Sequence, residues 1–122
     1  MADVRRGEIW QVQFSPATGS EMKLEHPALI LSAVILSIDA LNASRMPLVT
    51  VAPFTRVAPR TEGMLNFRVE PDGTNGLDAT SWAQPHLIRA VSREPRLQRR
   101  RVELVPADLE RVLQAVQSVM GL

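Results

Sequence analysis

Polar and apolar residues alternate along two stretches of the chain, residues 8–14 and 64–70. Alternation with a period of two puts every second side chain on one face, as in a strand with one buried side. The pattern therefore predicts two strands whose apolar positions face the core. These positions are Trp10, Val12 and Phe14 in the first stretch, which begins after Gly7, and Leu65, Phe67 and Val69 in the second.

Two further strands are predicted from runs that are apolar or rich in β-branched residues. Residues 28–31 follow a proline and form an apolar run typical of a strand that is buried on both faces, and this strand is expected to extend to residue 36 and to bend or run into the next element. Residues 48–52 form a second run, which we expect to stop at Pro53 because proline removes a backbone donor. Thr55 and Arg56 follow, so both are expected at the tip of this strand.

Glycine and proline divide the next part of the chain. Residues 38–44 fit a short helical turn, and residues 71–76, Pro-Asp-Gly-Thr-Asn-Gly, carry the densest turn signal. A strand pair is expected within residues 81–92, with Pro85 at a sheet edge or a bulge. Residues 93–100 contain another proline and are expected to form a basic turn.

The last segment has the clearest helical pattern. Pro106 suits a first helical position and Gly121 suits a helix end. Apolar residues between them recur at the spacing of one helical face, a stripe that also offers a surface for a second copy of the chain. They are Leu109, Val112, Leu113, Val116 and Met120. Several short strands before one closing helix predict a mainly β (α+β) fold, a small, strongly bent antiparallel barrel formed by one domain, residues 1–122.

The composition limits the kind of protein. A chain of 122 residues with 45% apolar and 22% charged residues can bury one core. Without cysteine, the two histidines do not make a usual zinc site, although a magnesium site made of carboxylates stays open, and we expect no metal or other cofactor. Residues 1–6 lack the apolar core of a signal peptide, and no apolar run approaches the roughly 18 residues of a membrane span. We therefore expect a cytoplasmic protein without a membrane partner.

The net charge of +1 is unevenly distributed. Residues 89–101 contain six arginines and one glutamate, whereas residues 1–88 and residues 102–122 each sum to −2. A local charge of +5 suits a polyanionic partner, but these arginines can also simply solvate a surface turn. Aromatic residues make up only 4% of the chain, which argues against binding by extensive base stacking. Trp10, Trp82 and His86 are interpreted as packing or edge residues.

A polar loop, residues 16–27, joins the first two predicted strands and contains Glu21, Lys23, Glu25 and His26. Loops that are held by a rigid scaffold commonly carry functional side chains. The loop is therefore a candidate place for chemistry, although a histidine before a proline is also common as a plain surface residue.

Short segments along nearly the whole chain form a specific series when taken together. They are Arg6-Gly7-Glu8-Ile9-Trp10, Phe14-Ser15-Pro16, Gly19-Ser20-Glu21, Pro27-Ala28-Leu29-Ile30-Leu31-Ser32, Val51-Ala52-Pro53-Phe54-Thr55, Asn75-Gly76-Leu77, Ser81, Ile88-Arg89-Ala90-Val91 and Arg96-Leu97. In order and spacing they resemble the MazF/PemK toxins of bacterial toxin–antitoxin pairs. The resemblance implies an SH3-like barrel that dimerises and cuts single-stranded RNA at short preferred sequences without a metal. It also implies an acidic antitoxin that neutralises the toxin by lying over the RNA groove.

The resemblance further implies a catalytic pair, an arginine just before the proline of the second strand and a threonine at the tip of the third. Thr55 matches the threonine, whereas His26 stands where the family has its arginine. A family glutamine, six residues after the serine that Ser81 matches, falls on Leu87 in this chain. Gln84 lies nearby in the sequence but does not occupy the matching position.

Cleavage of RNA by its own 2′-hydroxyl needs a group that takes this proton, a group that protonates the leaving 5′-oxygen, and donors that hold the phosphate charge. An imidazole with a pKa of ~6.5 can transfer protons near neutral pH, which an arginine does much less readily. We therefore expect His26 to transfer a proton, Thr55 to hydrogen-bond the scissile phosphate, and Glu21 to accept the 2′-hydroxyl proton or orient the imidazole. The residues that are expected to contact RNA are Ser20, Lys23, Arg56, Ser81 and Arg89.

Two other functions stay open because the family arginine and glutamine are replaced. One is a toxin on the same barrel that binds a protein and does not cut RNA, like the gyrase-inhibiting relatives of this family. The other is a barrel that binds RNA or its antitoxin and has lost cleavage. Incubation of the protein with a long single-stranded RNA in EDTA separates these alternatives from a metal-independent nuclease.

Overall fold

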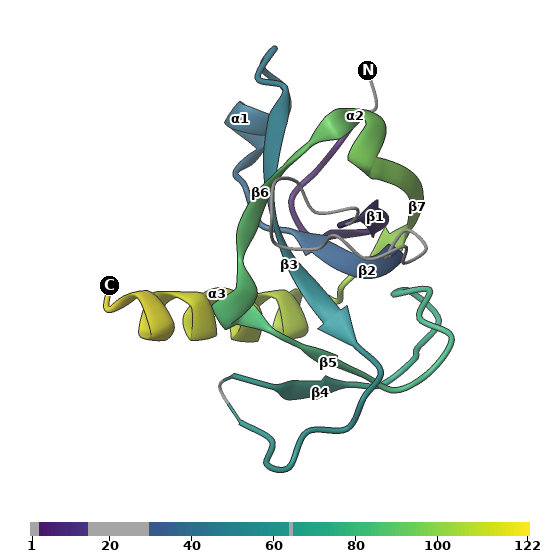
Figure 1. Ribbon diagram of the computed structural model, residues 1–122, viewed down its shortest axis with the longest axis vertical. Helices are drawn as coiled ribbons and strands as arrows, with labels where there is room; N and C mark the ends of the chain where they lie inside the picture. Colours follow the sequence, from purple (N-terminus) through teal and green to yellow (C-terminus); the bar gives the residue numbers. More distant parts are fainter. Residues whose placement is uncertain (1–2, 15–29, 64) are drawn as a thin grey trace, which may run out of the picture.

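The computed structural model describes residues 3–14, 30–63 and 65–122. In these ranges the strands form one antiparallel sheet in the order β4-β5-β3-β2-β1-β7, and β6 also pairs with β3 (Figure 1). The strands are β1 (Glu8–Gln13), β2 (Ile30–Ile35), β3 (Leu48–Thr55), β4 (Phe67–Val69), β5 (Ser81–Ala83), β6 (Arg89–Ser92) and β7 (Leu97–Glu103). The helical segments are α1 (Asp39–Asn42), η1 (Pro85–Leu87), α2 (Arg93–Arg96) and α3 (Pro106–Met120). The predicted mainly β (α+β) fold with a C-terminal helix is confirmed.

The strand β3 is longer than the sequence predicted, because Pro53 does not end it. Pro53 pairs with Ala33 of β2 on one side. On its other side, β3 pairs first with β6 up to Val51 and then with β5 from Phe54 onward, so Pro53 falls between the two partners. A residue without an amide hydrogen is tolerated at a position where no neighbouring strand needs that donor. The strand therefore continues to Thr55.

Three other predictions about strands are wrong in part. Leu65 was expected to face the core, but β4 begins only at Phe67 and Leu65 is 45% exposed. The stretch 81–92 does hold two strands, but β5 and β6 are separated by η1 and each pairs with β3 rather than with the other. The predicted basic turn over residues 93–100 is confined to α2, since β7 begins at Leu97 and pairs with β1.

The helix α3 agrees closely with its prediction. It begins at Pro106, and Gly121 ends it in the left-handed conformation with φ of +73°. Its apolar stripe packs against a cluster of buried residues under the sheet, with Val112 fully buried. The stripe is therefore used mainly within the chain's own core, and only its last member, Met120, is more than half exposed.

The sheet separates two apolar clusters. Neighbouring residues of β1 belong to different clusters, Ile9 to the one under α3 and Trp10 to the other. The same division holds on β2 for Val34 and Ala33, as expected when successive side chains point to opposite faces of a strand. The two faces of one sheet are thus both covered, which keeps the end of β3 in a fixed place.

Glu8 is a buried carboxylate with a structural role. It accepts hydrogen bonds from the Arg5 amide at 2.8 Å and from the Trp10 indole at 3.2 Å, and Arg100 lies 3.0 Å from its second oxygen. A buried charge is tolerated when its oxygens are all satisfied. These contacts tie β1 to β7 and to the residues before it.

The predicted turn at residues 71–76 is confirmed. The Asp72 carboxylate accepts hydrogen bonds from Thr74 and Asn75, and the fully buried Asn75 side chain donates to the Glu70 carbonyl at 2.8 Å. The predicted helical turn at residues 38–44 is also present, as α1. Among the described residues no helix is long and apolar enough to cross a membrane.

Candidate active site

A pocket of about 440 Å³ lies beside the C-terminal end of β3. Strands β1, β2, β3 and β5 all contribute to it, together with the residues that follow β3. Its polar lining residues are Gln11, Ser32, Thr55, Arg56 and Ser81. Three of the residues that the sequence singled out, Thr55, Arg56 and Ser81, are therefore brought together although they lie on two separate strands and a loop.

Thr55 is the last residue of β3 and pairs with Trp82 of β5. Its hydroxyl oxygen accepts a hydrogen bond from the Val57 amide at 3.1 Å, which fixes the direction in which the chain leaves the strand. Within the described part of the chain the hydroxyl proton has no acceptor. A hydroxyl that is oriented in this way can donate to an oxygen of a ligand in the pocket.

Arg56 places a positive charge beside the hydroxyl. Its guanidinium lies 3.3 Å from the Asp78 carboxylate, and both side chains are about 60% exposed, at 60% and 61%. An ion pair between exposed groups contributes little free energy, so Arg56 can exchange this partner for an anion at low cost. The pocket thus combines a hydroxyl donor with a cation, a combination that suits a phosphate.

Ser81 contributes differently from the way the sequence suggested. The residue is only 3% exposed, and its hydroxyl donates to the Ala79 carbonyl at 3.0 Å. Because its proton is already donated to the backbone, the serine offers the pocket an acceptor rather than a donor. It forms part of the wall that β5 gives to the site.

Arg89 is not brought into this pocket. It lies on β6, paired with Val51, and its guanidinium sits over the Phe14 ring at 5.3 Å from the centroid. Phe14 follows the last residue of β1, so Arg89 marks a different part of the surface. The distance between the guanidinium and the ring is that of a cation–π contact.

Four predicted site residues, Ser20, Glu21, Lys23 and His26, lie outside the described residues. The described chain resumes at β2, and both Leu31 and Ser32 of this strand line the pocket. In the sequence, Leu31 follows His26 by five residues.

Sequence reasoning missed two polar residues of the pocket, Gln11 and Ser32. They face each other across β1 and β2, and both are half-buried. The alternation of β1 did place Gln11 at a polar position, but only the pairing of the strands puts it next to the end of β3. Leu87, where the family glutamine falls, is 45% exposed, and the Gln84 amide donates to the Pro53 carbonyl at 3.0 Å.

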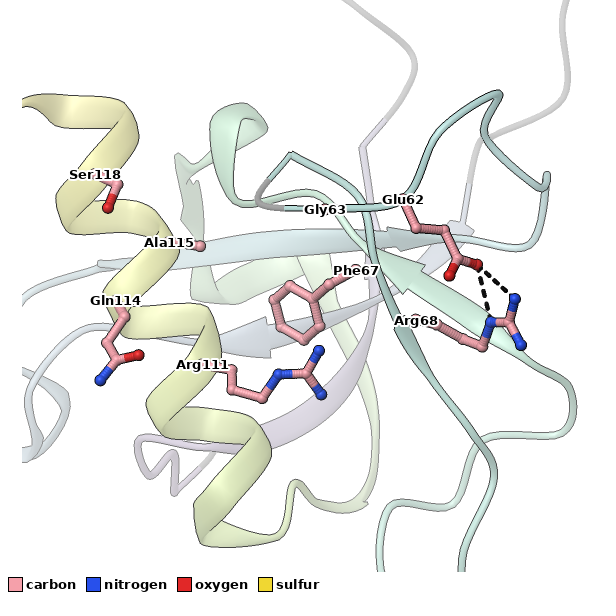
Figure 2. Close-up of a pocket in the computed structure, with 8 residues that line it drawn as sticks. All are labelled: Glu62, Gly63, Phe67, Arg68, Arg111, Gln114, Ala115 and Ser118. Carbon is pink, nitrogen blue, oxygen red and sulfur yellow. Dashed lines mark hydrogen bonds and ion pairs between the residues drawn. The ribbon is translucent and has the colours of Figure 1, made fainter.

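A second groove, of about 530 Å³, lies between α3 and residues 62–63 and 67–68 (Figure 2). Each of its charged groups already has a partner: Arg68 lies 2.7 Å from Glu62, and Arg111 lies over the Phe67 ring at 4.6 Å and 3.5 Å from Asp108 of the same helix. We read this groove as part of the packing between α3 and β4 rather than as a reactive site.

The Trp82 indole makes a hydrogen bond to Glu62, one of the residues that line this second groove. It donates to the Glu62 carboxylate at 2.7 Å, and this hydrogen bond, followed by the one from Arg68, lowers the pKa of Glu62. Trp82 is 8% exposed, so its interpretation as a packing residue is confirmed, as is that of Trp10 at 7%. His86 is exposed and lies in η1.

Comparisons of the sequence with known proteins point to a single family. The family model of PemK-like, MazF-like toxins of type II toxin–antitoxin systems matches residues 5–120. The chain is 36% identical over 96 residues to a protein named endoribonuclease MazF9 from Mycobacterium tuberculosis, an alignment that covers 75% of each chain.

Solved structures of low sequence identity share the fold. The crystal structure of MazF from Deinococcus radiodurans (Form-I) has a TM-score of 0.73 at 20% identity and covers 100% of both chains. A MazE–MazF structure from the same organism (Form-III) has a TM-score of 0.76 at 17% identity and covers 99% of both chains. A mycobacterial endoribonuclease in complex with its cognate antitoxin has a TM-score of 0.68 at 16% identity and covers 100% of this chain and 97% of the other.

Proposed function

The chain belongs to the PemK-like, MazF-like toxins of type II toxin–antitoxin systems, and we propose that it is an endoribonuclease that cuts single-stranded RNA without a metal ion. The observation that carries the proposal is the pocket in which Thr55, Arg56 and Ser81 meet. The relative named endoribonuclease MazF9 supports the same activity.

The proposed reaction is attack of a ribose 2′-hydroxyl on the adjacent phosphate. A bond forms between the 2′-oxygen and phosphorus, and the bond between phosphorus and the 5′-oxygen of the next nucleotide breaks. The products are a 2′,3′-cyclic phosphate and a 5′-hydroxyl, so no water enters this step. Negative charge gathers on the non-bridging oxygens, where a hydroxyl donor and a guanidinium stabilise it most. Thr55 and Arg56 are the groups that we assign to these two roles.

Proton transfer is assigned to His26, with Glu21 as the group that accepts the 2′-hydroxyl proton or orients the imidazole. The support is the position of His26 in the family pattern and the chemistry of an imidazole, whose pKa of ~6.5 suits both removal and donation of a proton near neutrality. We assign further RNA contacts, away from the Thr55 hydroxyl and the Arg56 guanidinium, to Ser20, Lys23 and Arg89.

Two partners belong to the proposal. One is a cognate acidic antitoxin that covers the RNA groove, as the family resemblance implies. The other is a second copy of the chain, because exposed apolar side chains gather around α1 and the start of β3. These side chains, each 44–50% exposed, are Ile38, Leu41, Met46 and Leu48. We place the protein in the cytoplasm, where its RNA substrate is found.

Incubation of the purified protein with a long single-stranded RNA in EDTA tests the function directly. Discrete fragments that appear in EDTA as well as in magnesium are the expected result. Intact RNA together with inhibition of a purified topoisomerase would instead identify a gyrase-inhibiting toxin. Intact RNA that is retained by the protein would identify a barrel that binds RNA without cutting it.

A further inference from the structure

The pairing of the strands extends the polar lining of the pocket to the edge of the sheet. Gln11 of β1, which lines the pocket, pairs with Ser32 of β2 on one side and with Arg99 of β7 on the other. Residues that lie directly opposite each other on neighbouring antiparallel strands project from the same face. Ser32, Gln11 and Arg99 therefore form one line of polar side chains across three strands, which we call the polar row.

A β-bulge sets the position of Arg99 in this row. The register of β1 against β7 moves from the pair Gln11 and Arg99 to the pair Val12 and Leu97, so Gln98 is an extra residue on β7. The Gln98 side-chain Nε2 donates to the Gln13 Oε1 at 2.9 Å, on the same face as Gln11. A bulge re-aims the side chains beside it, and bulges are common next to active sites. Here it adds two polar side chains of β7 to the face that leads to the pocket.

Two other arginines of the same segment, Arg100 and Arg96, already have partners. Arg100 pairs with the buried Glu8 at 3.0 Å on the opposite face, and Arg96 donates to the Gln13 carbonyl at 3.0 Å. Arg99 is exposed and has no carboxylate within ion-pair distance among the residues that the structure describes. Its charge is thus available to an anion from outside.

The distance across the sheet decides which anion Arg99 can meet. Three strand spacings separate the strand of Thr55 from that of Arg99, roughly 14 Å at ~4.8 Å each. A phosphate that is bound at Thr55 is too far away for direct contact with this guanidinium. A second phosphate further along the same RNA strand can lie over the polar row and reach it.

We infer that Arg99 is a substrate-positioning residue that binds a non-scissile phosphate of the RNA at the sheet edge, with Gln11 and Ser32 lining the path from the Thr55 pocket. This inference rests on the proposed function. Its chemistry is that of a sequence-independent phosphate contact, which strengthens binding of any RNA long enough to reach the edge and leaves the chemical step unchanged.

The test compares Arg99→Gln with Arg45→Gln and Arg99→Lys. Arg45 is an exposed arginine that precedes the N-terminal end of β3, roughly 25 Å along the strand from Thr55, so its replacement removes the same charge outside the row. Cleavage of a long single-stranded RNA is followed at one mapped site over a series of salt concentrations. Binding of the same RNA with a 2′-deoxy residue at that site is measured by fluorescence anisotropy.

We expect Arg99→Gln to raise KM and the Kd about five- to tenfold at low salt with kcat unchanged, and to reduce the slope of log Kd against log salt by about 0.7. Arg99→Lys should keep most of the affinity, and Arg45→Gln should match the wild type. If Arg99→Gln and Arg45→Gln give the same KM, Kd and salt dependence while the wild type cleaves RNA, the inference about Arg99 is wrong and the proposed function stands. A loss of kcat at unchanged KM, or weaker binding of an acidic antitoxin peptide with RNA binding intact, also overturns it. A wild type that neither cleaves nor binds RNA overturns the proposed function as well.

Discussion

The Thr55 hydroxyl oxygen is held in place by a hydrogen bond from the backbone two residues further along the chain. Val57 donates to its oxygen as the backbone leaves β3, and the pairing with Trp82 fixes the strand end from the other side. A donor that is oriented before the substrate arrives stabilises developing charge without reorganisation, which is why a single such donor can have a large effect on rate. Arg56 then adds charge next to a hydroxyl whose oxygen is already held in place.

Thr55→Val should lower kcat about 10²-fold with a small change in KM, because it removes a donor to the phosphate while it keeps the shape of the side chain. Thr55→Ser keeps the hydroxyl and should retain most of the activity. Initial rates on one mapped cleavage site measure both variants, and circular dichroism checks their fold. Equal rates for Thr55→Val and the wild type would exclude the hydroxyl from the reaction.

His26→Ala should lower the rate about 10²-fold or more if the imidazole transfers a proton in the cleavage step. The wild-type rate should also change with pH between ~5.5 and ~8, since this is the range in which an ordinary histidine titrates. The measurement is single-turnover cleavage across this range, with His26→Arg as the variant that restores the family residue. A flat pH profile with cleavage as the limiting step would argue against a titrating histidine.

At the residue scale the sequence predicted Thr55 and Ser81 because a family pattern marks them, and Arg56 because it follows Thr55 at the strand tip; the structure brings the three together. Gln11 and Arg99 could not be predicted in the same way. Their place depends on which strands pair and on a bulge between β1 and β7, and neither is written in the local pattern of apolar residues.

The contact between α3 and the start of β1 depends on one glycine. Gly7 has φ of +91°, a conformation that side chains with a Cβ rarely adopt, and a Cβ built there would lie 3.0 Å from the Leu109 side chain. The same residue accepts a hydrogen bond from the Leu104 amide at 2.9 Å, just before the helix begins. Backbone conformation and close packing thus both favour glycine at this position.

Gly7→Ala should destabilise the protein by about 1–3 kcal/mol, through backbone strain and displacement of Leu109. Gly73→Ala is the matched control, because no atom lies within 4 Å of a Cβ at that position. Urea unfolding followed by circular dichroism measures both. A Gly7→Ala protein as stable as the Gly73→Ala protein would show that the helix tolerates the displacement.

The turn between β4 and β5 makes stability depend on pH. Hydrogen bonds from the Thr74 amide, the Thr74 hydroxyl and the Asn75 amide lower the pKa of Asp72 below its ordinary value of 3.8. A carboxyl whose pKa is lower in the folded state contributes stability above its unfolded pKa, and this contribution is lost as the pH falls through the folded value.

Asp72→Asn should therefore lower the Tm at neutral pH, and its difference from the wild type should shrink as the pH falls below about 4. Asp3→Asn, at an exposed position, serves as the control. Thermal unfolding at neutral and acidic pH measures both. A difference that stays constant with pH would mean that the carboxylate charge plays no part in the turn.

At the scale of elements, periodicity and capping residues were enough for α3, whose stripe, first proline and last glycine were all predicted correctly. Periodicity was not enough to predict β7, because glutamine and arginines at successive positions give this strand no alternation of apolar and polar residues. Its partner β1 supplies the apolar contacts instead. The end of β3 was predicted too early, at Pro53, for a related reason. A proline ends a strand only where a neighbouring strand needs the backbone N–H that proline lacks.

The whole molecule is a sheet with two covered faces, with α1 beside the first part of β3 (Figure 1). A pocket lies at the C-terminal end of β3, and exposed apolar side chains lie on and around α1, near the start of this strand. The pocket and the polar row each contain an arginine, Arg56 and Arg99, which suits the proposed binding of single-stranded RNA. The apolar side chains around α1 lie at the opposite end of β3, so a second copy could bind there and leave the pocket open.

Light scattering should give the mass of two chains at micromolar concentration. Leu41→Glu should reduce this mass to one chain, because it puts a charge into the apolar surface around α1. Leu65→Glu changes a leucine of nearly equal exposure, 45% against 46%, at a distant position and should leave the mass unchanged. A wild-type mass of one chain would exclude the dimer, and a dimeric Leu41→Glu protein would move the contact elsewhere.

The most direct test of the proposed chemistry is cleavage of an RNA that has a single 2′-deoxy residue at a mapped cut site, in the presence of EDTA. The 2′-hydroxyl is the nucleophile in the proposed reaction, so the wild type should leave this position intact. It should cut the all-ribose control to give a 2′,3′-cyclic phosphate and a 5′-hydroxyl. Cleavage at the deoxy position, or loss of all cleavage of the control RNA in EDTA, would contradict a metal-independent attack by the 2′-hydroxyl.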